Sequence, residues 1–502
     1  MRKTFFIIIL YMMTLLPADV VAEEERIPYE KFTFSYTRGE ELFFQDYNGD
    51  ELLDVIIQDG RRLKFHAQKA GNRFDTKNAY QLDIPTPYSH YDFKKDKQNE
   101  GRDIALLCSE GIDILRFEND RYTSPPKRIL SRELSFLLQI HRINLTYLFL
   151  DIDGDETDDL VIPIQKSYCI YLNDDYSTPA LRIPMEEEYQ FFCREFQKTV
   201  FQSAFYTSFR QGISSPRMTK PKKNGIVQFT TDQRVYTLRE DKTFRVEIKP
   251  EPSLDSIDSE EEIKKEKGFT NYRTYDFNQD GKKDQMSYHF TRGTLAPKTV
   301  FKIYLSRQDG SLPDKPESII RTSAICASWY QFPVMKVDDD DYLDLVLLNL
   351  DYQGTSLESN LKAFVKRGLS GKLDFYLWQE TQGYPKRPSF SFPIQLKYQP
   401  FGHIYSFGDF FRTGGDLTGD GKPDLLILLD HRNYMLHAFV NRDRGFSKHP
   451  TAVFKLPSPY TDFEHEDLNQ DGIEDLIFTC RDPKSDNIFL DVLFLSVHKD
   501  PN

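Results

Sequence analysis

One acidic nonapeptide recurs along the chain and is its clearest candidate for chemistry. Its six copies begin at Asp46, Asp151, Asp276, Lys336, Asp416 and Asp467. In five of them an oxygen-bearing side chain occupies each of positions 1, 3, 5 and 9. Alternate residues of a tight loop can direct oxygens to one point, and Ca²⁺ takes about six to eight oxygen ligands. The predicted calcium ligands are Asp46, Asn48, Asp50 and Asp54; Asp151, Asp153, Asp155 and Asp159; Asp276, Asn278, Asp280 and Asp284; Asp416, Thr418, Asp420 and Asp424; and Asp467, Asn469, Asp471 and Asp475.

The details of the nonapeptide fit a tight cation loop, with a backbone carbonyl from position 7 completing the ligand set. Gly281, Gly421 and Gly472 at position 6 permit a sharp turn. An EF-hand would need Glu at position 12, where this chain has Ile57, Ile162, Ser287, Ile427 and Phe478. The alternative is an Asp-rich turn whose side chains bond only to its own backbone. Converging carboxylates would then raise one another's pKa with no cation to relieve them.

The copy at Lys336 differs from the other five. Its first position carries an ammonium that could take the place of a cation, facing Asp338, Asp340 and Asp344. We therefore expect this loop to be metal-free or to bind weakly.

The elements that must position these loops are short strands. Each good copy runs into an apolar, β-rich stretch, and helical periodicity is weak throughout. Eroded copies at Lys95 and Arg217 bring the count to eight units, beginning near residues 46, 95, 151, 217, 276, 336, 416 and 467, at about 60 residues per unit. Such a unit cannot bury its own face, so it must stack on copies of itself.

The predicted fold is all-β, a single β-propeller of seven or eight four-stranded blades over residues 23–502 with the calcium loops on one rim. After the last loop the chain has too few residues for a full blade. An alternating segment beginning at Phe32 precedes the first loop. We therefore expect this N-terminal strand to complete the last blade and close the ring.

The nonapeptide followed by an apolar strand, repeated in this way, resembles the FG-GAP/VCBS repeats of integrin α-subunits and of many bacterial secreted proteins. The resemblance implies calcium sites in hairpin loops between the first two strands of each blade. It carries the family's ligand positions over to Asp46, Asn48, Asp50, Asp54 and their counterparts. A clear Gly-Ala-Pro element is missing, and only Phe401-Gly402 matches the Phe-Gly part.

The N-terminus has the pattern of a secretory signal peptide. Arg2 and Lys3 precede an apolar run over residues 5–16, and small residues end at Ala22. We predict a signal peptide over residues 1–22 and export to the periplasm, the cell surface or the medium. The chain has only five cysteines, which argues against a disulfide scaffold. Cys169 and Cys193 are a possible pair, and Cys108 and Cys480 are expected to be buried thiols.

Charge and composition exclude several classes of protein. The net charge of −13 argues against a nucleic-acid binder, and no apolar run beyond the N-terminus is long enough to span a membrane. Residues 251–268 are expected to form a charged surface loop, and Arg217, Lys220, Lys222 and Lys223 an exposed basic turn. Asp430, His431 and His437 form a candidate acid/base group for which turn chemistry is the plainer interpretation. Trp378, in an insertion, would serve either a binding surface or the core.

The sequence shows no catalytic motif, and every motif that it does show is structural. We therefore expect an exported calcium-binding propeller that acts as a non-catalytic binding or adhesion module for a protein or glycan ligand. One alternative is a secreted carbohydrate-active enzyme, a lyase or hydrolase, with a site in the central channel. The other is a structural scaffold of a cell-envelope assembly.

Overall fold

The computed structural model describes a large part of the chain in separate ranges. These are residues 27–70, 73–74, 79–97, 101–134, 142–146, 148–164, 167–184, 217–219, 228–230, 234–239, 241–248, 268–280, 282, 284–291, 298–307, 311–322, 334–338, 340, 342–350, 368–380, 382–397, 411–430, 433–442, 445–457, 461–482 and 485–496. The predicted signal peptide, Cys193, Gly281, Phe401-Gly402, His431, Lys220 with Lys222 and Lys223, and residues 251–267 of the predicted charged loop lie outside them. Within these ranges the structure is all-β, which confirms the predicted class. No helix there has the length and hydrophobicity to cross a membrane.

The N-terminal half of the described chain forms a succession of small sheets. The first contains β2 (Glu41–Gln45), β3 (Asp54–Asp59), β4 (Arg62–His66) and β7 (Tyr80–Asp83). The second contains β8 (His90–Lys94), β9 (Asp103–Cys108), β10 (Gly111–Leu115) and β13 (Lys127–Ser131), with β14 (Asn144–Leu145) added in parallel beside β8. The third contains β15 (Phe149–Leu150), β16 (Asp159–Ile164), β17 (Ser167–Tyr171) and β18 (Leu181–Pro184). The fourth contains β19 (Arg217–Thr219), β20 (Gln228–Thr230), β21 (Arg234–Leu238) and β22 (Phe244–Ile248).

The C-terminal half repeats this plan. A further sheet contains β23 (Gly268–Tyr275), β24 (Asp284–Thr291), β25 (Lys298–Tyr304) and β26 (Ser318–Thr322). The next two sets are β27 (Val334–Met335), β28 (Asp344–Leu350), β29 (Gly368–Tyr376) and β30 (Phe390–Lys397), then β31 (Phe411–Gly415), β32 (Asp424–Asp430), β33 (Met435–Phe439) and β36 (Ala452–Lys455). A single parallel pair, Lys397 with Asp430, joins these two sets into one continuous sheet. Three small hairpins lie beside the sheets: β5 (Gln68–Lys69) with β6 (Arg73–Phe74), β11 (Phe117–Glu118) with β12 (Arg121–Tyr122), and β34 (Asn441–Arg442) with β35 (Gly445–Phe446).

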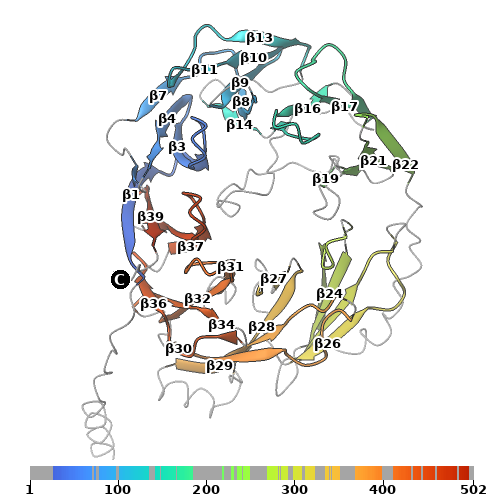
Figure 1. Cartoon of the computed structure of the whole chain (residues 1–502), viewed down its shortest axis with the longest axis vertical. Coiled ribbons are helices and arrows are strands. Elements are labelled where there is room, and N and C mark those ends of the chain that lie inside the picture. The colour runs from blue at the N-terminus through green and yellow to red at the C-terminus, as the bar shows by residue number, and fades with distance from the viewer. Residues whose placement is uncertain are drawn as a thin grey trace, which may run out of the picture.

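The last sheet contains both ends of the described chain. It consists of β37 (Thr461–Glu466), β38 (Asp475–Arg481), β39 (Asn487–Leu495) and, at its outer edge, β1 (Tyr29–Thr37). β1 pairs with β39 along its whole length, from Tyr29 opposite Leu495 to Thr37 opposite Asn487. The prediction that the N-terminal strand completes the last sheet is therefore confirmed. In Figure 1 the sheets follow one another around a ring, and the blue β1 lies beside the red β39.

The apolar core lies between neighbouring sheets, as expected for units that cannot bury their own faces. Phe34 of β1, Val55 of β3 and Phe494 of β39 belong to one buried cluster that joins the last sheet to the first. Another cluster brings together Leu107 of β9 and Leu160 of β16, and so joins the second sheet to the third. Because each cluster draws on two sheets, the hydrophobic effect holds the order of the sheets as well as the sheets themselves.

Candidate metal-binding loops

All six nonapeptides lie at the same place in their sheets, between the first two strands. Each joins a short antiparallel pair: β2 and β3, β15 and β16, β23 and β24, β27 and β28, β31 and β32, and β37 and β38. Position 9 is the first residue of the second strand in every case. The hairpin setting that the repeat resemblance implies is therefore what the structure shows.

The position 1 carboxylate caps the turn of its own loop. Asp416 accepts hydrogen bonds from the amides of Gly419 at 2.7 Å and Gly421 at 2.5 Å. Asp46, Asp151 and Asp467 accept equivalent bonds from positions 4, 5 or 6 of their own loops. These bonds fold the backbone around the carboxylate, so the turn forms from local Asx chemistry.

Position 6 requires a left-handed backbone. Gly421 and Gly472 have φ of 81° and 83°. Glu51 and Glu156 hold the same position at φ of 69° and 73°, in a region that costs residues with a Cβ about 1–2 kcal/mol. The role predicted for glycine is thus confirmed at Gly421 and Gly472. At the other two loops the chain carries strain instead.

The position 5 carboxylate accepts a hydrogen bond from the C-terminal part of its own loop. Asp50, Asp155 and Asp420 each accept a hydrogen bond from the amide two residues on, all at 3.0 Å, and Asp280, Asp340 and Asp471 do the same at 2.9 Å. Where position 3 is Asn48 or Asn469, its amide nitrogen also donates to the position 5 carboxylate. The side chains predicted as ligands therefore already converge through hydrogen bonds.

Position 9 has a role that the sequence did not indicate. Asp424 is buried, and both of its oxygens accept backbone hydrogen bonds: Oδ2 from Leu417 at 3.0 Å and Oδ1 from Asn441 at 2.8 Å. Leu417 is position 2 of the loop, whereas Asn441 lies just beyond the third strand. The same two bonds recur at Asp54, Asp159, Asp284, Asp344 and Asp475. Position 9 is thus a buried staple that ties the loop to the end of strand three.

Burial raises the pKa of the position 9 carboxyls, although their two backbone bonds oppose that shift. The pKa rises to about 8 for Asp54 and Asp475, to about 7 for Asp159, Asp344 and Asp424, and to about 6 for Asp284. The carboxylates at positions 1, 3 or 5 of the same loop add to the rise. A cation among them would lower these pKa values, because it favours the charged forms.

The eroded copy at Lys95 separates what the loop needs for folding from what a metal would need. It joins β8 and β9 at the same place in its sheet but lacks the acidic side chains at positions 1 and 5. Asp103 at position 9 is still buried, and its Oδ1 still accepts the amide of Phe117 at 2.9 Å. The bond from position 9 to the end of strand three is therefore kept where the predicted ligand set is lost.

Hydrogen bonds between neighbouring loops form a belt that sequence reasoning missed. In each rung the position 8 amide donates to a carbonyl at position 1 or 2 of the preceding loop. The rungs are Glu474 to Asp416 at 2.7 Å, Leu53 to Leu468 at 3.1 Å, Arg102 to Tyr47 at 2.9 Å and Asp158 to Lys95 at 2.9 Å. The belt runs through the loops at 416, 467, 46, 95 and 151, and so it crosses from the C-terminal part of the chain to the N-terminal part. Backbone bonds leave no residue-type signal, which is why the sequence did not reveal them.

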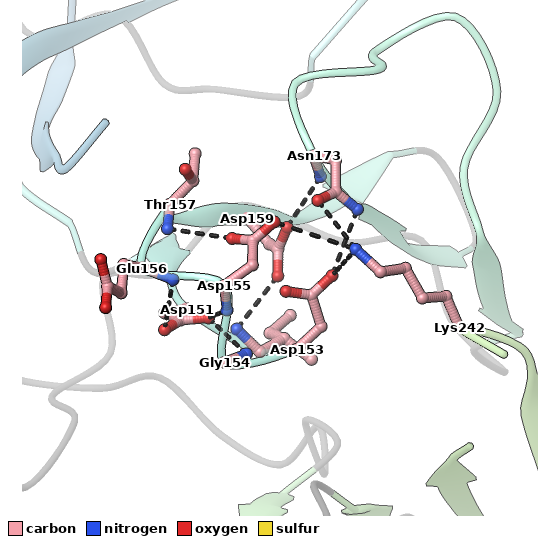
Figure 2. A network of polar contacts seen from close by, with 10 residues as sticks. Asp151, Asp153, Gly154, Asp155, Glu156, Thr157, Asp159, Asn173 and Lys242 are labelled. Atoms are coloured by element: carbon pink, nitrogen blue, oxygen red, sulfur yellow. Dashed lines mark hydrogen bonds and ion pairs between the residues drawn. The ribbon is translucent and has the colours of Figure 1, made fainter. Parts of the chain in front are cut away.

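The loop at residues 151–159 brings its acidic side chains closest together. Among the described residues, Asp151, Asp153 and Asp159 form a group whose oxygens lie within 4.8 Å of one another. The Asp153 side chain is 4% exposed, and its Oδ1 has no hydrogen-bond partner. A buried, unpaired carboxylate oxygen beside two other carboxylates fits a hard cation. Figure 2 shows this group with Lys242, from the turn between β21 and β22, pointing toward Asp153.

The copy at Lys336 keeps the backbone pattern of the others. Asp344 accepts the amides of Val337 at 3.0 Å and Trp378 at 2.8 Å. The expectation that this loop is metal-free or binds weakly stays a prediction. In the loop at Asp151 an ammonium from another sheet, that of Lys242, lies 2.8 Å from Asp153 Oδ2.

Three further sequence interpretations can be placed. Trp378 is buried and stacks on Phe277, so it belongs to the core, one of the two roles considered for it. Asp430 accepts two hydrogen bonds from Asn433, which is turn chemistry. Cys108, Cys169 and Cys480 are buried, as expected for the first and the last of them. Cys193, the other member of the possible pair with Cys169, lies outside the described residues.

Comparisons with known proteins reveal only distant similarity. No protein-family model matches the sequence, and no curated protein matches it. A lectin of Agrocybe aegerita that recognises non-reducing terminal N-acetylglucosamine is similar over 82% of this chain and 93% of its own, at 11% identity and a TM-score of 0.34. The Nup133 β-propeller domain of Vanderwaltozyma polyspora is similar over 82% of this chain and 97% of its own, at 11% identity and a TM-score of 0.32. At these scores neither similarity supports an inference about function.

Proposed function

We propose that this chain is an exported, closed β-propeller of eight blades. Among the described residues, eight sets of four strands can be counted when the sheet joined at Lys397 and Asp430 is divided in two. The pairing of β1 with β39 and the rung from Leu53 to Leu468 both support closure. The kinship with FG-GAP/VCBS repeats and the signal peptide over residues 1–22 are part of this proposal.

We further propose that the acidic loops bind calcium as a structural ion. The observation that carries this is the convergence of Asp151, Asp153 and Asp159 around an unpaired, buried oxygen. The ions would hold the loops and their rungs in place and take no part in a reaction. The protein would then act as a non-catalytic module that binds a protein or a glycan across the ring.

The calcium part of the proposal is tested on purified protein lacking residues 1–22. Calcium bound per chain is counted by atomic emission after equilibrium dialysis, and the melting temperature is measured in calcium and in EDTA. Calcium that binds the folded chain but not the unfolded chain stabilises the fold, by about 2.7 kcal/mol when the free calcium concentration is 100 times the dissociation constant. An equal melting temperature in the two buffers, with no bound calcium, would contradict this part.

The binding part needs separate assays. A glycan array and a pull-down from envelope extracts, each run in calcium and in EDTA, test for a ligand whose capture depends on the intact ring. Turnover of a polysaccharide by the purified protein would instead favour the carbohydrate-active enzyme. Stable incorporation into an envelope complex would favour the scaffold.

A further inference from the structure

Lys242 occupies a turn that is built to present it. The turn between β21 and β22 is closed by hydrogen bonds from the Arg239 amide to the Thr243 carbonyl at 2.8 Å and from the Lys242 amide to the Arg239 carbonyl at 3.0 Å. Asp241 accepts bonds from the amide and the hydroxyl of Thr243. Lys242 itself is left-handed, at φ of 61°. These bonds fix the backbone from which the lysine side chain extends.

The lysine ammonium meets oxygens of the neighbouring sheet. Nζ lies 2.8 Å from Asp153 Oδ2, 3.0 Å from Asn173 Oδ1 and 3.8 Å from Asp155 Oδ2. An ammonium has three N–H donors, and three oxygens surround it here. Asn173 also donates from Nδ2 to Asp153 Oδ2 at 3.2 Å, so the amide braces the same carboxylate (Figure 2).

This arrangement puts a positive charge among oxygens predicted to hold a cation. Asp153 and Asp155 are positions 3 and 5 of the loop. Asp153 is nearly buried, whereas half of the Lys242 side chain is exposed. The lysine side chain can therefore withdraw into water when an incoming cation takes over the neutralisation of Asp153. Asp153 Oδ1 is buried and has no hydrogen-bond partner, so it is an unused oxygen ligand for a cation that enters the loop.

The lysine also links two sheets. In the same two sheets, Ile170 of β17 and Tyr236 of β21 belong to one buried cluster. The contact at Asp153 thus continues a packed interface at its loop end.

We propose that Lys242 is the resident cation of the loop at residues 151–159. It neutralises Asp153 in the metal-free protein, ties the sheet of β19–β22 to that of β15–β18, and competes with calcium for the loop. The competition rests on the proposed calcium binding, whereas the tie between the sheets does not.

Hydrogen exchange read by mass spectrometry tests both parts on the full mature chain. In EDTA, Lys242→Met should raise exchange in peptides covering 239–243 by about fivefold, the factor that corresponds to about 1 kcal/mol for an ion pair at a surface. During a calcium titration of the same variant, the midpoint for protection of residues 151–159 should fall by about fivefold. Lys242→Arg keeps the charge and should stay near the wild-type midpoint.

Lys97→Met is the matched control. Lys97 Nζ lies 3.6 Å from Glu156 of the same loop, but both side chains are well exposed and Glu156 is not a predicted ligand. This variant should change neither exchange nor midpoint. The inference is overturned if Lys242→Met behaves like Lys97→Met. If no loop gains protection from calcium, the calcium proposal and the competition fail together. If loops 416–424 and 467–475 respond but Lys242→Met leaves the midpoint of 151–159 unchanged, only the competition fails.

Discussion

Replacing Asp424 by Asn separates the backbone role of position 9 from any metal role. The carboxylate is 2% exposed and accepts one backbone amide on each oxygen. Asparagine keeps one acceptor and turns an NH₂ donor toward the second backbone N–H. One buried N–H then loses its partner, and leaving such a group unsatisfied costs about 1–3 kcal/mol.

The substitution also removes a buried charge, so the pH of the measurement matters. Burial raises the pKa of Asp424 to about 7, and at pH 8 the wild-type carboxylate is mostly ionised and accepts both amides in full. The lost acceptor costs about 1–3 kcal/mol, whereas removal of the buried charge relieves its desolvation, so the two effects oppose one another in the free energy of unfolding at pH 8. Exchange of the amide that has lost its acceptor isolates the first effect, and we expect this exchange to be faster in EDTA as well as in calcium.

The assay combines urea unfolding with exchange of the Leu417 and Asn441 amides, both in EDTA. The amide that has lost its acceptor should exchange faster, whichever way the new side chain turns. Asp420→Asn is the control in the same loop, because Asp420 is exposed and accepts only the amide of Lys422. It should cost little in EDTA but abolish the calcium-dependent gain at this loop. Wild-type exchange of both the Leu417 and the Asn441 amides in Asp424→Asn in EDTA would refute the staple.

Three other outcomes are expected. Burial lowers the pKa of His90 from 6.5 to about 4. Its neutral ring therefore contributes stability above pH 6.5 that is lost as the pH falls toward 4. Unfolding titrations should show about 3 kcal/mol less acid destabilisation for His90→Asn than for wild type. Burial raises the pKa of Asp92 to about 8, so protonation of Asp92 stabilises the fold as the pH falls. This contribution is the same in wild type and in His90→Asn and cancels when their stabilities are compared. Equal pH profiles of the two proteins would contradict the role of His90. Glu51→Gly should raise the free energy of unfolding by about 0.5–1 kcal/mol, because glycine tolerates the φ of 69°, whereas Glu156→Ala should gain nothing from the same left-handed position. Removing residues 27–37 should expose β39 and lower the melting temperature by several degrees; an unchanged melting curve would show that β1 does not hold the last sheet.

The loops show where sequence reasoning succeeds. Their spacing and composition are local, and so is the Asx chemistry that folds them, with Asp416 bonding to residues three to five positions away. The hairpin setting, by contrast, was implied by the resemblance to FG-GAP/VCBS repeats, and the residues alone indicated only that each nonapeptide ends where an apolar strand begins. The lone N-terminal strand was placed correctly because an unfinished last sheet leaves an edge that must be paired.

The sequence by itself determined the repeating unit, which is an acidic turn followed by a buried strand. It also predicted that these units stack on one another and that the N-terminal strand completes the last of them. Tertiary structure decided the rest. It put the second oxygen of Asp424 against the distant amide of Asn441, set the rung from Leu53 to Leu468, and brought Lys242 to Asp153. These contacts join residues far apart in the chain through backbone groups or a single surface lysine. They depend on how sheets are placed beside one another, which no local pattern of residue types specifies.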